Sequence, residues 1–279
     1  MTSSRRKVVE RELKSIHLHR PEYSEGSDLD SVKHFLESLL PSVEVEIEPA
    51  ILASVKGREL DSVSGRLAGL RVKNPTEQEQ SHEPMFGEVD FERRAALGKA
   101  RVGGIIYDGR KLADVYGSLL DASVGLERTN IMFTQRLVST YSADDLRHHL
   151  RTVVFGFPSV ISIPGVVEAP ARPREYHILR QELEAMGAGQ LRLERLKSDF
   201  KGRFIDYGDA EINEVLKGLA LQTVLFHLSL RPFCGAPDCR LFNAHWQEEL
   251  IRSQITSGRL CAKHERQFDE LGKLPMIKW

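Results

Sequence analysis

The three cysteines of this 279-residue chain all lie near its C-terminal end, and a histidine completes them. The pattern is Cys234-x4-Cys239, then twenty-one residues, then Cys261-x2-His264. Two close pairs of soft donors can surround one ion, and thiolate and imidazole are the ligands that structural zinc prefers. Four protein ligands leave no open position for a reacting water. The pattern therefore predicts a structural zinc site rather than a catalytic one.

Composition and charge set broad limits on function. The apolar fraction is 41%, the charged fraction is 28% and the net charge is −1, so the chain lacks the basic surface that nucleic acid requires. The first residues, MTSSRRKVVERELK, contain no signal peptide, and no stretch approaches eighteen apolar residues. Three unlinked cysteines are the simpler alternative to a metal site. The metal-like spacing favours a reducing compartment, and we expect a cytoplasmic protein without a membrane partner.

The first 170 residues alternate between strand-like and helix-like patterns. Alternating apolar residues at 15–19 and 43–48 flank an amphipathic stretch at 28–40, and together they predict a strand, helix and strand in one right-handed crossover. Residues 1–12 are polar and are expected to be flexible. The remaining expectations are strands at 102–107, 130–133 and 153–155, helices at 110–120 and around His148 and His149, a long loop at 72–92 and a loop or edge segment at 157–175.

From residue 171 onward the pattern is helical. A long apolar helix is expected at 210–230, with Asp209 as its cap and Pro232 just beyond its end. Shorter helices are expected from Glu175, over 243–257 and from His264. These patterns predict an α/β (α+β) fold with one domain over 13–279: a mixed sheet with crossover helices over 13–170, then a helical part over 171–279 that zinc stabilises through segment 234–264.

The long helix leads directly into the cysteine cluster, and here the chain resembles the archaemetzincins, a family of zinc peptidases. Their pattern is HExxHxxGxx(H/D)C-x4-C-x-M-x17-C-x-x-C, in which a catalytic zinc site continues into a cysteine-rich one. Cys234, Cys239 and Cys261 match three of its cysteines, the last after a longer gap. His264 stands at the fourth cysteine and Leu241 at the methionine. The resemblance implies a metzincin-like domain with a structural zinc ion.

The first half of the family pattern is mostly replaced in this chain. His227 is in register with the second histidine of HExxH. The first histidine is Thr223, the glutamate is Val224, the glycine is Leu230 and the third ligand is Phe233. Peptide hydrolysis of this kind needs three zinc ligands, an open position and a carboxylate base. The resemblance therefore implies a degenerate metallopeptidase, a pseudoenzyme that binds zinc together with a peptide or protein partner.

A second resemblance covers most of the chain. The stretches NAHWQEEL and PSVISIPGVVEAPARPRE are similar to those of archaeal proteins classed as metallopeptidases. This similarity implies a metallopeptidase-like archaeal protein, a hydrolase by descent, and it adds no mechanism of its own.

Two other functions remain open at this point. His245 and Glu248, three residues apart on an expected helix, could join His227 in a relocated metal site of an active hydrolase, with Glu249 nearby. The simpler interpretation is that His227 packs in the core and the two glutamates are solvated. The other alternative is a zinc-ribbon nucleic-acid-binding or regulatory protein. The basic segment 192–203 suggests it, but the acidic residues of that segment and the net charge oppose nucleic acid.

Overall fold

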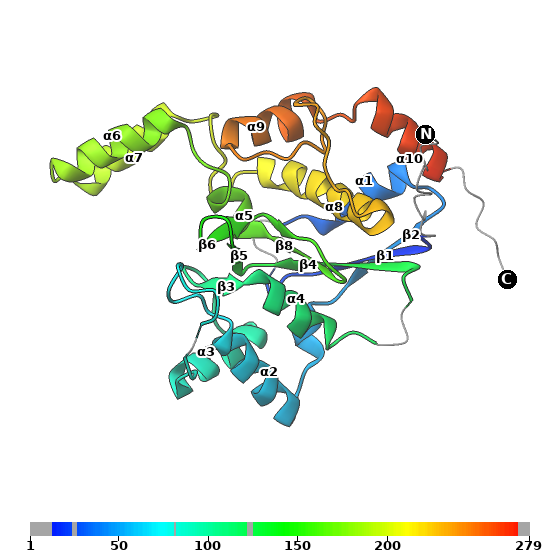
Figure 1. Ribbon diagram of the computed structural model, residues 1–279, viewed down its shortest axis with the longest axis horizontal. Helices are drawn as coiled ribbons and strands as arrows, with labels where there is room; N and C mark the ends of the chain where they lie inside the picture. The colour runs from blue at the N-terminus through cyan, green and yellow to red at the C-terminus, as the bar shows by residue number, and fades with distance from the viewer. Residues whose placement is uncertain (1–12, 24–26, 81, 122–124, 273–279) are drawn as a thin grey trace, which may run out of the picture.

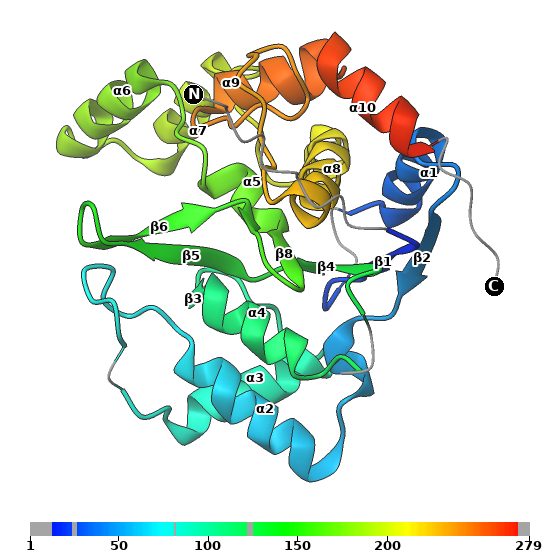
Figure 2. The same cartoon turned by 45° about the vertical axis from the view of Figure 1, so that its right-hand side comes forward.

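The computed structural model describes residues 13–23, 27–80, 82–121 and 125–272. The segment 1–12, expected to be flexible, lies outside the described residues. A central sheet separates two groups of helices, one on each face, and a pair of helices projects from the body at one end (Figures 1 and 2). No helix among the described residues combines the length and the apolar character that a membrane span requires.

The larger sheet is mixed, as the sequence predicts. Its strands are β1 (Ser15–His19), β2 (Glu44–Glu48), β4 (Arg128–Thr134), β7 (Val153–Val154) and β8 (Ser159–Ser162). Their order is β2-β1-β4-β8-β7, with β7 antiparallel to β8 and the other pairs parallel. Helix α1 (Leu29–Leu39) connects β1 to its parallel neighbour β2, so the expected strand–helix–strand unit is confirmed. Parallel strands need such a crossover.

Each face of this sheet carries its own apolar core. On β4, Ile131 and Phe133 contribute to the core shared with α1, whereas Met132 contributes to the core on the opposite face. Successive side chains of a strand point to opposite faces, so a sheet covered on both sides buries every residue of its central strands. The opposite core is covered by a short 3-10 turn, η1 (Ile51–Ser54), and by α2 (Gly57–Gly69), α3 (Phe86–Ala96) and α4 (Gly109–Gly117).

Helix α3 corrects the expected loop at 72–92. The helix begins at Phe86, where the Glu88 carboxylate accepts a hydrogen bond from the Met85 amide at 2.9 Å. This bond satisfies one of the donors that a helix start leaves without an intrahelical partner. Glu92, one turn further, is fully buried. Because glutamate is polar, the sequence around Glu92 favours a loop. The partners that satisfy its buried carboxylate come from other parts of the fold.

A smaller sheet contains β3 (Ile106–Asp108), β5 (Leu137–Ser142) and β6 (Arg147–Arg151), in the order β3-β5-β6. The expected short helix around His148 and His149 is wrong, because both residues lie on β6, opposite Tyr141 and Thr140 of β5. Leu146 adopts the left-handed conformation with a φ of 55° and helps to close the hairpin. Cross-strand pairing with β5 decides the conformation of this segment.

The proline-rich segment 157–175 is irregular only at 157–158 and 169–173, and its remaining residues lie in a strand and in helices. Its first part is β8, which lies between β4 and β7. Its second part is α5 (Ile163–Glu168), which begins where the Ser162 hydroxyl accepts a bond from the Gly165 amide at 3.0 Å. Pro164 occupies the first turn of α5, where its missing N–H costs no hydrogen bond. The projecting helices α6 (Arg174–Ala185) and α7 (Gln190–Asp199) follow.

The long helix α8 (Glu211–Ser229) confirms the expected helix at 210–230 and lies against the sheet (Figure 2). Every residue from Gly218 to Leu225 is buried. The helix ends at Ser229, and the next residue, Leu230, adopts the left-handed conformation that turns the chain away from the helix axis. The expected helix at 243–257 begins later, at α9 (Gln247–Ile251), and continues as the π-helix η2 (Arg252–Ser257) before α10 (Ala262–Gly272). Residues 243–246 lie outside the helix instead: the Ala244 amide donates to the Phe242 carbonyl at 3.1 Å, and Trp246 pairs with Ala171 in a parallel bridge.

A buried arginine joins several of these elements. Arg136 follows β4, is 0% exposed, and donates from one nitrogen to Glu22 and from the other to Glu92 at 2.7 Å. Glu92 also accepts from Arg71 at 2.6 Å and from the Tyr107 hydroxyl at 2.8 Å. Burial raises the pKa of the Glu22 carboxyl, but Arg136 and further hydrogen bonds outweigh it and bring that pKa below its usual value. The Glu22 carboxylate is therefore ionised and paired with Arg136 inside the protein.

We predict that Arg136→Met lowers the free energy of unfolding by about 3–5 kcal/mol, because it leaves the buried Glu22 carboxylate without its cation and Glu92 with Arg71 alone. The control, Arg147→Met, removes a cation that pairs with the exposed Asp145 and should change it by less than about 1 kcal/mol. Urea unfolding measures both. Since the folded-state pKa of Glu22 is lowered, this carboxylate stabilises the fold above about pH 4.3 and that contribution is lost as the pH falls. Equal urea midpoints for Arg136→Met and the wild type would contradict the role of this cluster.

Candidate metal centre

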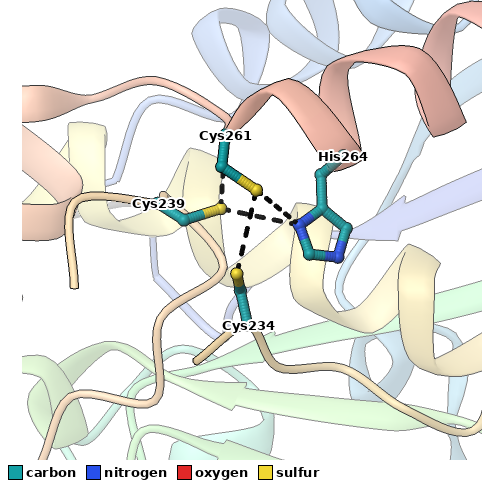
Figure 3. Close-up of side chains that lie close together, drawn as sticks. All are labelled: Cys234, Cys239, Cys261 and His264. Atoms are coloured by element: carbon teal, nitrogen blue, oxygen red, sulfur yellow. Dashed lines mark hydrogen bonds between the residues drawn. The ribbon is translucent and has the colours of Figure 1, made fainter. Parts of the chain in front are cut away.

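Three cysteine sulfurs and one histidine nitrogen converge after α8, as Figure 3 shows. The four ligand atoms, from Cys234, Cys239, Cys261 and His264, all lie within 4.8 Å of one another. The Cys234 and Cys261 sulfurs are 3.9 Å apart, and His264 Nδ1 lies 3.8 Å from the Cys239 sulfur and 3.2 Å from the Cys261 sulfur. Two sulfurs bound tetrahedrally at about 2.3 Å from zinc would be separated by about 3.8 Å. The geometry of the donors thus fits a zinc ion.

Backbone hydrogen bonds hold the four ligands in two tight turns. The first turn is closed by the bond from the Cys239 amide to the Ala236 carbonyl at 3.0 Å, and the second by the bond from the His264 amide to the Cys261 carbonyl at 2.8 Å. Amides also point at the sulfurs, since the Ala236 amide lies 3.4 Å from the Cys234 sulfur and the Cys261 amide 3.4 Å from the Cys239 sulfur. Such donors orient sulfur ligands and stabilise their thiolate form.

The electrostatics of the cluster favour a cation. Burial raises the pKa of the Cys239 thiol to about 11. At Cys261 burial acts in the same direction, but hydrogen bonds from the His264 amide and the neighbouring thiols outweigh it and lower the thiol pKa. Burial, assisted by Lys263, lowers the pKa of His264, which is therefore neutral at pH 7. Three clustered thiols deprotonate together only when a positive ion offsets their charge, so metal binding here releases protons.

The cluster connects the end of α8 to the last helix. Cys239 and Leu241 are buried in the same apolar core as α8 and as Phe268 of α10. The side-chain amide of Gln254, on η2, donates to the carbonyl of Arg240, the residue after Cys239, at 2.6 Å. The same amide group packs on Gly218 of α8, where a Cβ would collide with it. A metal at the four ligands would therefore clamp both C-terminal helices against the core.

The weak catalytic candidates His227, His245 and Glu248 have separate partners. His227 is 1% exposed, and its Nε2 donates to the Leu126 carbonyl at 2.7 Å. His245 is exposed and lies before α9 rather than on it, in contrast to the expected helix. The Glu248 carboxylate pairs with Arg203 at 2.7 Å. In the part of the chain that the structure describes, neither group of clustered metal-type ligands contains any of the three. The structure does not bring them together.

The second group of clustered ligands is not predicted by the sequence analysis. His17 of β1 lies between Glu46 and Glu48 of β2, with its Nδ1 at 3.3 Å and 2.7 Å from their carboxylates. His17 is buried and its other nitrogen contacts the Ser15 hydroxyl at 3.2 Å. Hydrogen bonds on both ring nitrogens, to Glu48 and to Ser15, account for the position of His17. The alternation of histidines on one strand and glutamates on the next is the signal that could have found the group, once the parallel register was known.

A pocket of about 400 Å³ lies beside α8. Its sides are formed by strand β7, by Leu219 and Gln222 of α8, by β6, and by residues 242–245 between the metal cluster and α9. Gln222 donates to the Phe242 carbonyl at 3.2 Å and so connects α8 to that segment. No local sequence pattern indicates this pocket, because its lining comes from distant parts of the chain.

Comparison with known proteins identifies the family of this chain. The model of a family described as "Probable metallopeptidase family (DUF6775)" matches residues 12–271. The chain therefore belongs to this family, and the predicted metallopeptidase relationship is confirmed. Among solved structures, the chain is similar to archaemetzincin from Methanopyrus kandleri, with 12% identity, 93% of this chain and 95% of that chain covered, and a TM-score of 0.44. Curated proteins yield no match.

We predict that Cys239→Ser abolishes stable zinc binding, because it removes the most buried of the three sulfurs. The C-terminal helices should then loosen while the sheet stays folded, so limited proteolysis should cut after about residue 230. Zinc content by mass spectrometry and the proteolytic pattern measure these effects, and zinc should dissociate as the pH falls, because protons displace it from the thiolates. His245→Ala is the control and should keep its zinc. A Cys239→Ser protein with normal zinc content would rule the site out.

Proposed function

We propose that this chain is a non-catalytic member of its metallopeptidase family. In this proposal Cys234, Cys239, Cys261 and His264 hold one structural zinc ion, and the pocket beside α8 binds a peptide or an extended segment of a partner protein. None of the three cysteines forms a disulfide, which supports a reducing, cytoplasmic setting.

The state of α8 carries the proposal. Thr223 and Val224 are each 0% exposed, and the Thr223 hydroxyl donates to the Ala220 carbonyl of its own helix at 2.7 Å. Val224 belongs to the main apolar core. A metal that activates water needs three ligands, an open position and a base within reach of that water. Two buried side chains without metal-binding chemistry occupy the positions at which the family pattern has a ligand and the base.

The pocket supports binding in place of catalysis. Its volume and its mixture of apolar walls with a few polar groups are typical of ligand sites. Strand β7 lines it and is the last strand of its sheet. An edge strand can accept an extended peptide through backbone hydrogen bonds, while neighbouring pockets receive the side chains of that peptide.

We predict no zinc-dependent cleavage of a quenched-fluorescence peptide library by the purified protein, with or without added zinc. Loss of the general base alone lowers a rate by about 10² to 10⁴, and loss of two ligands removes the metal that polarises the peptide carbonyl. Metal analysis of the same sample should give one zinc per chain. Cleavage that disappears in both His227→Ala and His245→Ala would overturn the proposal in favour of a relocated catalytic site.

We further predict that Thr223→His combined with Val224→Glu restores no peptidase activity. The substituted positions are enclosed by the core, and Phe233 still occupies the third ligand position. The double variant should instead lose stability, because it buries ionisable groups in apolar surroundings. Thermal unfolding and the same peptide library measure the two effects. Cleavage by a folded double variant would show that the scaffold is competent despite Phe233 and the enclosing core.

A further inference from the structure

Two arginines face the pocket beside α8 without a carboxylate among the residues that line it. Arg110 lies in the first turn of α4 and Arg151 at the end of β6. His245 lines another side, and every other polar side chain of the lining is an uncharged threonine, glutamine or asparagine. A concave site with two permanent positive charges and no acid raises the local concentration of anions.

The two arginines differ in pairing from Arg71, Arg136 and Arg240, whose guanidinium groups pair with carboxylates. Arg151 donates from Nε to the Thr140 hydroxyl at 2.8 Å, and among the described residues its guanidinium forms no ion pair with a carboxylate. Burial lowers the pKa of Arg151, and the charge of Arg110 lowers it further. The negative charge of Asp145 acts in the opposite direction and raises the pKa of Arg151, but this carboxylate is already paired with Arg147 at 2.9 Å. An anion between the two guanidinium groups would relieve their repulsion.

Part of the remaining lining is apolar, and it includes Phe155, Leu219, Phe242 and Leu250. Guanidinium groups bind planar carboxylates through paired hydrogen bonds. The pocket therefore complements a ligand with a carboxylate at one end and an apolar group next to it. At the end of a polypeptide, the terminal carboxylate lies directly beside the last side chain.

We propose that Arg110 and Arg151 bind the C-terminal carboxylate of a peptide whose last side chain is apolar and enters the pocket. This inference rests on the proposed peptide-binding function and specifies the class of peptide. Capture of a free carboxylate is a known mode of peptide recognition. A bound peptide would displace part of the water around the two guanidinium groups, and a terminal carboxylate would replace the lost hydrogen bonds. A peptide without that carboxylate would leave them unmade, and this difference would give the specificity.

The experiment compares fluorescently labelled peptides that end in leucine or phenylalanine, each as the free acid and as the C-terminal amide. Fluorescence anisotropy gives the affinities. The free acid should bind at least about tenfold more tightly than the amide, because it gains charge-assisted hydrogen bonds that the amide lacks. Arg110→Gln and Arg151→Gln should each reduce this preference by about tenfold. Arg147 lies on the same strand as Arg151 but outside the pocket lining. The control variant Arg147→Gln should therefore keep the preference.

A second set of measurements separates the inference from the function on which it rests. Equal affinities for acid and amide peptides would overturn the carboxylate assignment and leave peptide binding intact. N-acetyl-phenylalanine, a single residue with a free carboxylate, tests the subsite alone by NMR titration. If this compound binds the wild type and does not bind Arg110→Gln, the result would support the subsite even when longer peptides do not bind. The absence of binding by every probe would overturn the inference.

Two further controls guard against indirect effects. Arg151→Lys keeps the charge but loses the planar fork, so it should retain part of the preference if the arginine contacts the ligand. Thermal unfolding checks that each variant is folded, and the exposed Arg110 provides the variant least expected to disturb the structure. Inorganic phosphate that displaced the peptide at lower concentration than acetate does would overturn the choice of carboxylate as the bound anion.

Discussion

The arrangement around the pocket depends on the buried cation Arg136. Its side chain joins Glu22, which follows β1, to Glu92 of α3, and its backbone carbonyl accepts a bond at 2.7 Å from the Ser162 hydroxyl that also begins α5. One residue thus connects both sheets and the helices on opposite faces. Buried charges are stable only when every partner is present. The hairpin of β5 and β6, which directly follows Arg136, and helix α5 are therefore placed by the same cluster. The hairpin lines the pocket, and so do Ala169 and Pro170, which directly follow α5.

The metal cluster and the pocket share a segment of chain. The Phe242 amide donates to the Cys239 carbonyl at 2.8 Å, and a short irregular run leads from there to the start of α9; residues 242–245 of this run line the pocket. The four metal-type ligands lie on either side of this run in the chain, and Gln222 of α8 donates to its Phe242 carbonyl. A structural metal can therefore influence ligand binding without contact with the ligand, through the backbone that it holds in place.

Helix α8 shows what the core requires of a central helix. The helix is buried along most of its length because helices and the sheet surround it, and this burial needs apolar residues rather than ligands. Val224 satisfies the packing requirement fully. His227 is a core histidine that donates to a backbone carbonyl. The charged guanidinium groups that line the pocket beside α8, those of Arg110 and Arg151, come from other elements.

The sequence determined those features that depend on short spacing. The four metal-type ligands form two local turns, so their spacing predicts their convergence once both turns meet, and the periodicity of α8 and of the first crossover unit needs only neighbouring residues. The local sequence pattern predicts the wrong conformation for His148 and His149 and for much of the segment 157–175, because pairing with distant strands decides their conformation. The separation of His227 from His245 and the approach of Arg110 to Arg151 depend on the register of strands and on helix packing. Such long-range contacts are set by the free energy of the whole core, which no local pattern encodes, and only the tertiary structure decided them.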